Sequence, residues 1–322
     1  MSSARSRFVQ HAIVILGVLF AFIETASPQA VPAQTNKEVR QHAAAEFNKT
    51  PLAVVPLAEQ IYLFTGDGGN VVAISDGSII LLIDSGLESR ASELNDAVYQ
   101  TFHRPIMNIV NTHWHFDHVG GNQYFASGGV TIIAQEQVQK RLASEYDIPP
   151  AEVAAGRFTT KGIPTVTFGD SMTIKMGAEQ VRLYHYGPAH TDGDTVIFFE
   201  PANVVVLGDI FSANTYPVID LSAGGSFTGL IAALDRVLAA CNPQTKIIPG
   251  HGPVVSKVEL QAYRDMLGTV ASRVEALIAS GKSVSQVLAA APTSEFDAKW
   301  GGGYVSGATF TVMAYDSMAS RK

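Results

Sequence analysis

The chain has 322 residues, of which 47% are hydrophobic and 16% charged, a composition typical of a globular protein with a sizeable apolar core. Its 22 basic and 29 acidic residues give a formal net charge of −7 and are spread along the chain without a basic block. Because a nucleic-acid-binding surface requires clustered Lys and Arg, the composition argues against nucleic acid as a partner. The single cysteine, Cys241, excludes an intrachain disulfide.

The N-terminal residues have the pattern of an export signal. Two arginines precede an apolar run over residues 12–23, which is too short to span a bilayer comfortably, and small residues and prolines follow. We predict a signal peptide over residues 1–33, cleaved after Ala33 or alternatively after Ala30. The mature protein is then expected to be periplasmic or secreted, without stable membrane association; a retained N-terminal anchor is the alternative.

After this segment, residues 34–52 are predicted to be an N-terminal linker and residues 53–322 a catalytic domain. Short β-rich runs alternate with turn residues in the first half, and Asp76-Gly77 between two such runs is a strong hairpin signal. We expect strands at 61–64, 71–75, 78–84, 106–110 and 131–134, and helices at 89–102 and 135–144.

The second half repeats this order of strands followed by mixed strand and helix. We expect strands at 165–168, 171–176, 181–186, 195–199, 204–207 and 246–248, and helices at 227–240, capped by Ser226, and at 258–278. Residues 145–162 contain two prolines and two glycines and are interpreted as an insertion or flap. Two sheets packed face to face and covered by outer helices satisfy this order, which predicts an α+β fold.

The segment His113-Trp114-His115-Phe116-Asp117-His118 holds three of the nine histidines of the chain. Residues i and i+2 of an extended segment point the same way, so His113 and His115 can present their imidazoles to one point. Asp117 and His118 follow where the chain turns and can face a second point nearby. A carboxylate among imidazoles suits Zn²⁺, and also Fe, Mn or Co. The segment therefore predicts a metal site.

Three further candidates each lie at the end of a predicted strand in a stretch that contains glycine: His190, Asp209 and His251. A buried strand that delivers one polar residue at its end is a rigid way to place a ligand. The glycine-rich motifs of dinucleotide and nucleoside triphosphate sites and the G-x-S-x-G motif of serine hydrolases are absent from the sequence. The residues thus indicate metal chemistry without a protein nucleophile.

The order H-x-H-x-D-H, then His, Asp and His, resembles the metallo-β-lactamase superfamily over residues 54–251. The resemblance implies a four-layer αββα sandwich with two Zn²⁺ ions per chain at one edge, Fe or Mn being alternatives. It implies that the first ion is held by His113, His115 and His190. It implies that the second is held by Asp117, His118 and His251, with Asp209 bridging both. The resemblance also implies that Asp84 supports the ligand loop by hydrogen bonding, without binding a metal itself.

The expected reaction is hydrolysis of a small molecule by a hydroxide shared between the two metals, with Asp117 as a catalytic residue that accepts a proton. Tyr216 is a candidate for substrate binding. Asp192 and Asp194 are expected either to orient ligand imidazoles or to stabilise their turn. His185 is expected to be an ordinary strand residue.

The substrate remains open between several classes. We expect a cyclic amide or ester, with β-lactams as the leading substrate because of the export signal. Asp209 favours the alternative, a thioester or lactone hydrolase resembling glyoxalase II or the homoserine-lactone lactonases, since the resemblance implies a bridging Asp in those enzymes. A third alternative is an iron-dependent oxygenase resembling the persulfide dioxygenases. The sequence leaves the oligomeric state open.

Overall fold

The computed structural model of the protein describes residues 50–66, 68–145, 162–303 and 305–319. The predicted signal peptide, most of the predicted linker and nearly all of the 145–162 segment lie outside these residues. Within the described ranges, none of the helices is long and apolar enough to cross a membrane.

The first half of the domain forms a seven-stranded sheet in the order β1 to β7. Neighbouring strands are antiparallel from β1 to β4 and parallel from β4 to β7. The strands are β1 (Ala53–Ala58), β2 (Ile61–Thr65), β3 (Val71–Ser75), β4 (Ile80–Ile83), β5 (Ile106–Val110), β6 (Thr131–Gln135) and β7 (Val166–Phe168). Their helices are η2 (Glu88–Arg90), α2 (Ala91–Phe102), α3 (Phe116–Val119), α4 (Asn122–Ser127) and α5 (Glu136–Glu145).

The second half forms a five-stranded sheet in the order β12-β11-β10-β9-β8. Its strands are β8 (Ser171–Met176), β9 (Glu179–Tyr184), β10 (Val196–Glu200), β11 (Val204–Val206) and β12 (Lys246–Ile248). Its helices are η4 (Gly208–Ile210), η5 (Leu221–Ala223), α7 (Phe227–Ala240), α8 (Lys257–Ala279), α9 (Val284–Ala289), α10 (Asp297–Trp300) and α11 (Gly307–Ala319).

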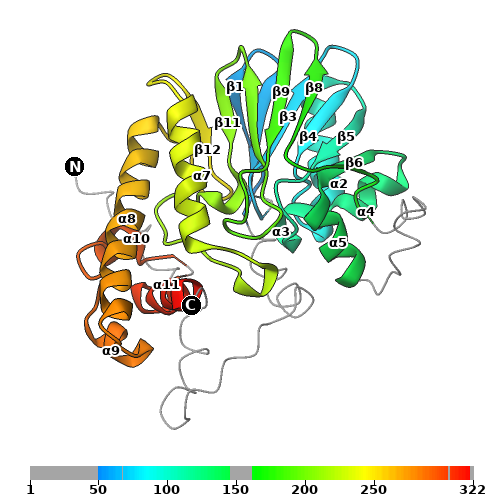
Figure 1. Ribbon diagram of the computed structural model, residues 1–322. Coiled ribbons are helices and arrows are strands. Elements are labelled where there is room, and N and C mark those ends of the chain that lie inside the picture. The colour runs from blue at the N-terminus through cyan, green and yellow to red at the C-terminus, as the bar shows by residue number, and fades with distance from the viewer. Residues whose placement is uncertain (1–49, 67, 146–161, 304, 320–322) are drawn as a thin grey trace, which may run out of the picture. The chain divides into compact units, whose positions relative to one another are not determined.

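Alternation along the strands separates three hydrophobic layers. In β4, Leu81 and Ile83 pack between the two sheets, whereas Ile80 and Leu82 pack on the outer side with α2 and α4. In β10, the even-numbered positions pack against α7, α8 and α11, and the odd-numbered ones face the first sheet. Because successive strand residues point to opposite faces, both sheets bury both sides. Figure 1 shows the two sheets side by side, with α7 and α8 flanking one and α2, α4 and α5 flanking the other.

The predicted αββα sandwich is confirmed, including the Asp76-Gly77 turn between antiparallel β3 and β4 and the cap of α7 by Ser226. Strand β1 was not predicted, because it is an exposed edge strand that contains Pro56, where a missing N–H is tolerated. The short helices α3 and α4 and the three helices after α8 were also missed.

Asn70 joins the two halves of the domain at the edge where β2 turns into β3. Its side-chain amide donates to the carbonyls of Pro249 and Gly252 at 2.9 Å each, and its backbone N–H donates to Gly250 O at 2.8 Å. These bonds hold the loop that carries His251 against the first sheet.

Candidate metal centre

The seven predicted ligands come together at one edge of the sandwich. The segment 113–118 follows β5 directly and ends in α3, whereas His190 precedes β10, Asp209 lies in η4 after β11, and His251 follows β12. Most residues of these strands are buried, so the strands carry the polar residues to the edge on a rigid base. The structure places all seven side chains in two adjacent clusters.

The first cluster consists of His113, His115, His190 and Asp209, whose ligand atoms all lie within 4.8 Å of one another. His190 Nε2 is 2.9 Å from His115 Nδ1. Asp209 Oδ2 is 3.7 Å from His190 Nε2 and 4.0 Å from His113 Nε2. Three imidazoles and a carboxylate oxygen thus surround one point.

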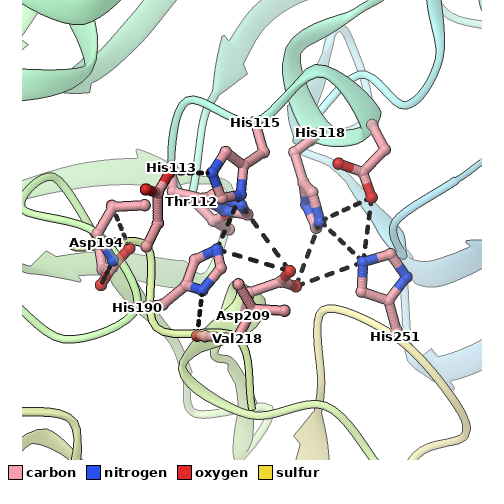
Figure 2. Close-up of polar contacts among 12 residues, drawn as sticks. Thr112, His113, His115, His118, His190, Asp194, Asp209, Val218 and His251 are labelled. Carbon is pink, nitrogen blue, oxygen red and sulfur yellow. Dashed lines mark hydrogen bonds and ion pairs between the residues drawn. The ribbon is translucent and has the colours of Figure 1, made fainter. Parts of the chain in front are cut away.

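The second cluster consists of Asp117, His118 and His251. Asp117 Oδ2 is 3.1 Å from His251 Nε2 and 3.8 Å from His118 Nε2. The other oxygen of Asp209, Oδ1, is 3.3 Å from His118 Nε2 and 3.5 Å from His251 Nε2. Figure 2 shows the Asp209 carboxylate between the two groups of histidines, with contacts to both. This is the bridging position that the resemblance implies.

Asp84 lies behind both clusters, as expected. It accepts the backbone N–H and the hydroxyl of Thr112, both at 2.7 Å, and its Oδ2 is 2.8 Å from His118 Nδ1. Thr112 Oγ1 is in turn 3.0 Å from His113 Nδ1. The Nδ1 atoms of both histidines therefore have partners away from the centre, which leaves their Nε2 atoms to face it.

Two further supports were missed from the sequence. Asp220 Oδ2 is 2.9 Å from His115 Nε2, and the carbonyl of Val218 is 2.8 Å from His190 Nδ1. Histidine ligands usually donate their second N–H to such a carboxylate or carbonyl, which fixes the ring and its tautomer. The Asp220 side chain also accepts the N–H of Ala223 and thereby caps η5. The sequence could therefore indicate a helix cap at Asp220, but not its contact with His115.

Two glycines allow the chain to approach the centre closely. A Cβ on Gly69 would collide with the imidazole of His118, and a Cβ on Gly250 would collide with the carboxylate of Asp209. Any residue larger than glycine at these two positions would therefore displace a candidate ligand.

The two clusters differ in charge. Burial lowers the pKa of His190 to about 4 and that of His113 well below its usual value, so these rings are neutral at pH 7. Burial also lowers the pKa of His251, but the carboxylates of Asp209 and Asp117 outweigh this effect and raise the pKa of His251 to about 10. Burial raises the pKa of Asp117, but His118 and His251 lower it to about 2.

The residues fit a pair of divalent metal ions. Within the described residues, His113 Nε2 is buried and has no hydrogen-bond partner, although it faces the middle of the first cluster. An unpaired buried imidazole nitrogen is costly unless a ligand binds it. Imidazoles with carboxylates are the donor set of zinc, and also of iron. The geometry can therefore hold two ions that share Asp209.

The prediction that Tyr216 binds substrate is wrong for this structure. The side chain is 1% exposed, its ring stacks on Phe310, and its hydroxyl donates to Asp297 Oδ1 at 2.8 Å. Burial and the neighbouring Asp297 raise the pKa of this hydroxyl. Tyr216 thus belongs to the core between the loop after η4 and the C-terminal helices.

The neighbouring polar residues stabilise the loop around His190. Asp194 accepts the N–H and the hydroxyl of Thr191, and burial raises its pKa to about 7. Asp192 pairs with Arg141, and His185 Nδ1 bonds to the carbonyl of Asp194. For Asp194 the contacts support the turn-stabilising alternative, whereas Asp192 ties the same loop to Arg141 of α5.

Comparison with known proteins identifies the family. The model of the metallo-beta-lactamase superfamily matches residues 64–252, more than half of the chain. The chain belongs to the metallo-beta-lactamase superfamily. It is therefore a metal-dependent hydrolase of this superfamily, and its two clusters are compatible with a dinuclear metal site.

The relatives found are distant. A metallo-beta-lactamase type 2 from Bacteroides fragilis is 23% identical over 245 residues, covering 73% of this chain and 89% of that protein. The alpha subunit of a 2,4-dinitroanisole O-demethylase from Nocardioides sp. is 25% identical over 212 residues, covering 64% of this chain and 60% of that protein.

Solved structures support the same fold. A metallo-beta-lactamase from Pontibacter korlensis matches with a TM-score of 0.55 and 22% identity, covering 68% of this chain and 99% of that one. The sec-alkylsulfatase Pisa1 from Pseudomonas sp. matches with a TM-score of 0.64 and 18% identity, covering 82% of this chain and 50% of that one. At these identities the likeness concerns the fold alone.

Proposed function

We propose that this protein is an exported hydrolase that binds two Zn²⁺ ions in the seven-residue centre and cleaves a cyclic amide or ester. β-Lactams are the leading substrates, since two of the relatives are named metallo-beta-lactamase type 2. The observation that carries the two-metal part of the proposal is Asp209, whose two oxygens face the two clusters, whereas the choice of β-lactams rests on the relatives and on the export signal. Export rests on the N-terminal sequence pattern, and a mature N-terminus at Gln34 would support it.

The exposure of the ligands supports a substrate that approaches from one side. His113, His118 and His190 are almost fully buried and form the floor of the centre. His115 is 16% exposed and His251 24%, so these two rings border the solvent. A substrate can therefore reach the two clusters without a change in the buried histidines.

The protein residues have defined tasks in this proposal. Two bound zinc ions would supply Lewis acidity and lower the pKa of water towards about 7, so that a hydroxide nucleophile forms at neutral pH. Asp117 is 12% exposed and ionised at neutral pH, so its carboxylate can accept a proton. Asp84, Asp220 and the Val218 carbonyl hold the imidazoles in the tautomers that leave their inner nitrogens free.

A second candidate is a thioester or lactone hydrolase, and the same observation favours it. The resemblance implies a bridging aspartate in enzymes of that type, which matches the position of Asp209 between the clusters. An iron-dependent oxygenase is the remaining alternative, because the donor set also suits iron.

Metal analysis of the mature protein, coupled to a hydrolysis panel, tests these proposals. The panel includes a β-lactam, an acyl-homoserine lactone, a glutathione thioester, a phosphodiester and an alkyl sulfate. We expect two zinc ions per chain, and hydrolysis that a strong chelator abolishes and added zinc restores. Full activity after exhaustive dialysis against the chelator would refute the metal-dependent mechanism, whereas about one iron per chain with O₂ consumption would support the oxygenase.

The matched variants are His190→Ala and His185→Ala. Both remove an imidazole from the same loop region, but only His190 faces the centre, whereas His185 bonds to the Asp194 carbonyl. We expect H190A to abolish turnover and to lower the bound metal, and H185A to keep both. Equal metal content in the two variants would contradict the assignment of His190.

A further inference from the structure

Residues 211–226, which connect η4 to α7 and are called the linking loop below, contact three of the candidate ligands. Besides the contacts of Val218 and Asp220 with the imidazoles of His190 and His115, the N–H of Asp220 donates to His190 O at 2.9 Å. The N–H of Ala213 donates to His251 O at 2.9 Å. The position of the linking loop therefore sets the orientation of two ligand rings.

The linking loop is anchored on its other side through Tyr216. The Tyr216 ring stacks on Phe310 in α11, with centroids 4.9 Å apart and an interplanar angle of 17°. Its N–H donates to Trp300 O at 2.9 Å. Its hydroxyl donates to Asp297 Oδ1 at 2.8 Å and lies 3.2 Å from Thr293 O. All four partners lie C-terminal to the family match at 64–252.

The chain between the anchor and the site is short and stiff. Pro217 alone separates Tyr216 from Val218. Proline fixes its own φ near −65°, and it restricts the residue before it to extended conformations. A shift of Tyr216 is therefore passed on to the Val218 carbonyl and to Asp220 rather than absorbed between them.

The C-terminal residues and the linking loop also pack closely. A Cβ on Gly303 would collide with the side chain of Thr215, whereas a Cβ on Gly302 would meet nothing within 4 Å. A Cβ on Gly307 would collide with the carboxylate of Asp297. The chain thus keeps glycine at the two positions where the C-terminal segment meets Thr215 and Asp297.

We propose that Tyr216 and Asp297 are positioning residues of the metal centre. Through their hydrogen bond, the helices after α8 hold the linking loop and thereby the imidazoles of His115 and His190. The inference rests on the proposed two-metal centre. It makes the C-terminal helices part of the apparatus that binds the first ion.

The test is the metal affinity of Tyr216→Phe, which removes the hydroxyl and retains the stacked ring. Zinc affinities are measured by competition with a chromophoric chelator, and the visible spectrum of the Co²⁺-loaded protein reports the geometry around the ligands. Loss of a partner in direct contact with a ligand lowers metal affinity about 10–100-fold, so a residue one contact further away should give about 3–10-fold. We expect this loss of affinity for the first ion, together with an altered Co²⁺ spectrum. The first ion is identified as the one that the H190A variant no longer binds.

The control is Thr311→Val in α11, where the hydroxyl is buried and, among the residues that the structure describes, donates to Gly307 O within the same helix. A wild-type protein that binds no metal would refute the proposed function itself. If the wild type binds two ions, then equal affinities and spectra for Y216F and T311V would overturn the inference. An equal loss of affinity for both ions, together with a lowered melting temperature of the metal-free protein, would also overturn the inference.

A second pair of variants tests the same link without altering Tyr216. Gly303→Ala pushes against Thr215, whereas Gly302→Ala enters open space. We expect G303A to lower the affinity for the first ion about 3–10-fold, because the support of its ligands is displaced. G302A should match the wild type. Identical affinities for the two alanine variants would contradict the link.

Discussion

Asp84 and Asp220 support the metal centre from two different parts of the fold. Asp84 directly follows β4, is 1% exposed and bonds to both Thr112 and His118. Asp220 belongs to the linking loop, is 17% exposed and bonds to His115. Each carboxylate fixes a ligand imidazole, but one is built into a sheet and the other depends on a loop.

This difference affects the strength and the origin of the support. A hydrogen bond is stronger where water is excluded, and a partner left unpaired there costs more. Asp84 is held by its own strand and by Thr112, whereas Asp220 keeps its position through Ser222, Ala223 and the anchor at Tyr216. Under the proposals above, the first ion would be supported partly by the C-terminal helices, and the second mainly by the sheet.

The largest effect is expected for Asp84→Asn. Asp84 has φ +63°, a conformation that asparagine adopts readily, so the substitution changes the carboxylate and not the backbone. Whichever way the new amide turns, its NH₂ group meets a donor: the backbone N–H of Thr112 at the Oδ1 position, or the Thr112 hydroxyl together with His118 Nδ1 at the Oδ2 position. We expect a 10–100-fold loss of metal affinity and about 1–3 kcal/mol of destabilisation. Competition titration and chemical denaturation of the metal-free protein measure the two effects.

Asp220→Asn should have a smaller and more local effect. An amide N–H facing His115 Nε2 favours the tautomer with its proton on Nδ1, the atom that faces His190. We expect about a tenfold loss of affinity for the first ion, with the second nearly unchanged. Ser222→Ala, which removes one bond to Asp220, is the control and should stay near the wild type. A D220N protein that loses both ions equally would abolish the contrast with Asp84.

The smallest effect is expected for Ser226→Ala at the end of the linking loop. Its hydroxyl accepts the N–H of Gly229 and caps α7. Loss of such a cap costs about 1 kcal/mol of stability. Thermal unfolding should detect this loss while both metal affinities stay unchanged. A lower affinity for the first ion in S226A would mean that the whole linking loop, rather than Tyr216 and Asp220, positions the ligands.

Much of the fold and the ligand set could be predicted, because both leave local patterns. Short continuous apolar runs such as that of β4 mark strands buried on both faces, and H-x-H-x-D-H is confined to six residues. The placement of Asp84 behind His118 followed from the family resemblance. The structure brings these residues together as expected.

The missed features depend on contacts distant in sequence. Asp220 lies in a loop without periodicity, and nothing local shows that its carboxylate reaches His115, which is 105 positions away. Tyr216 follows Asp209 closely in sequence, yet its ring turns to Phe310 because the C-terminal helices cover it. Helix α11 was missed because its buried face combines Gly307, Thr311 and Ser317 with Phe310 and Ala314, so hydropathy does not distinguish that face and no amphipathic pattern marks it.

His118 and His251 are 133 positions apart in the sequence, yet their Nε2 atoms lie 3.4 Å from each other. An unfolded chain does not hold these atoms together, so metal ions at the proposed centre would bind the native state in preference. Such binding adds about 4 kcal/mol to the free energy of unfolding when the free metal is at 1,000 times its dissociation constant. The supply of metal in the compartment where the protein folds would therefore govern its lifetime as well as its activity.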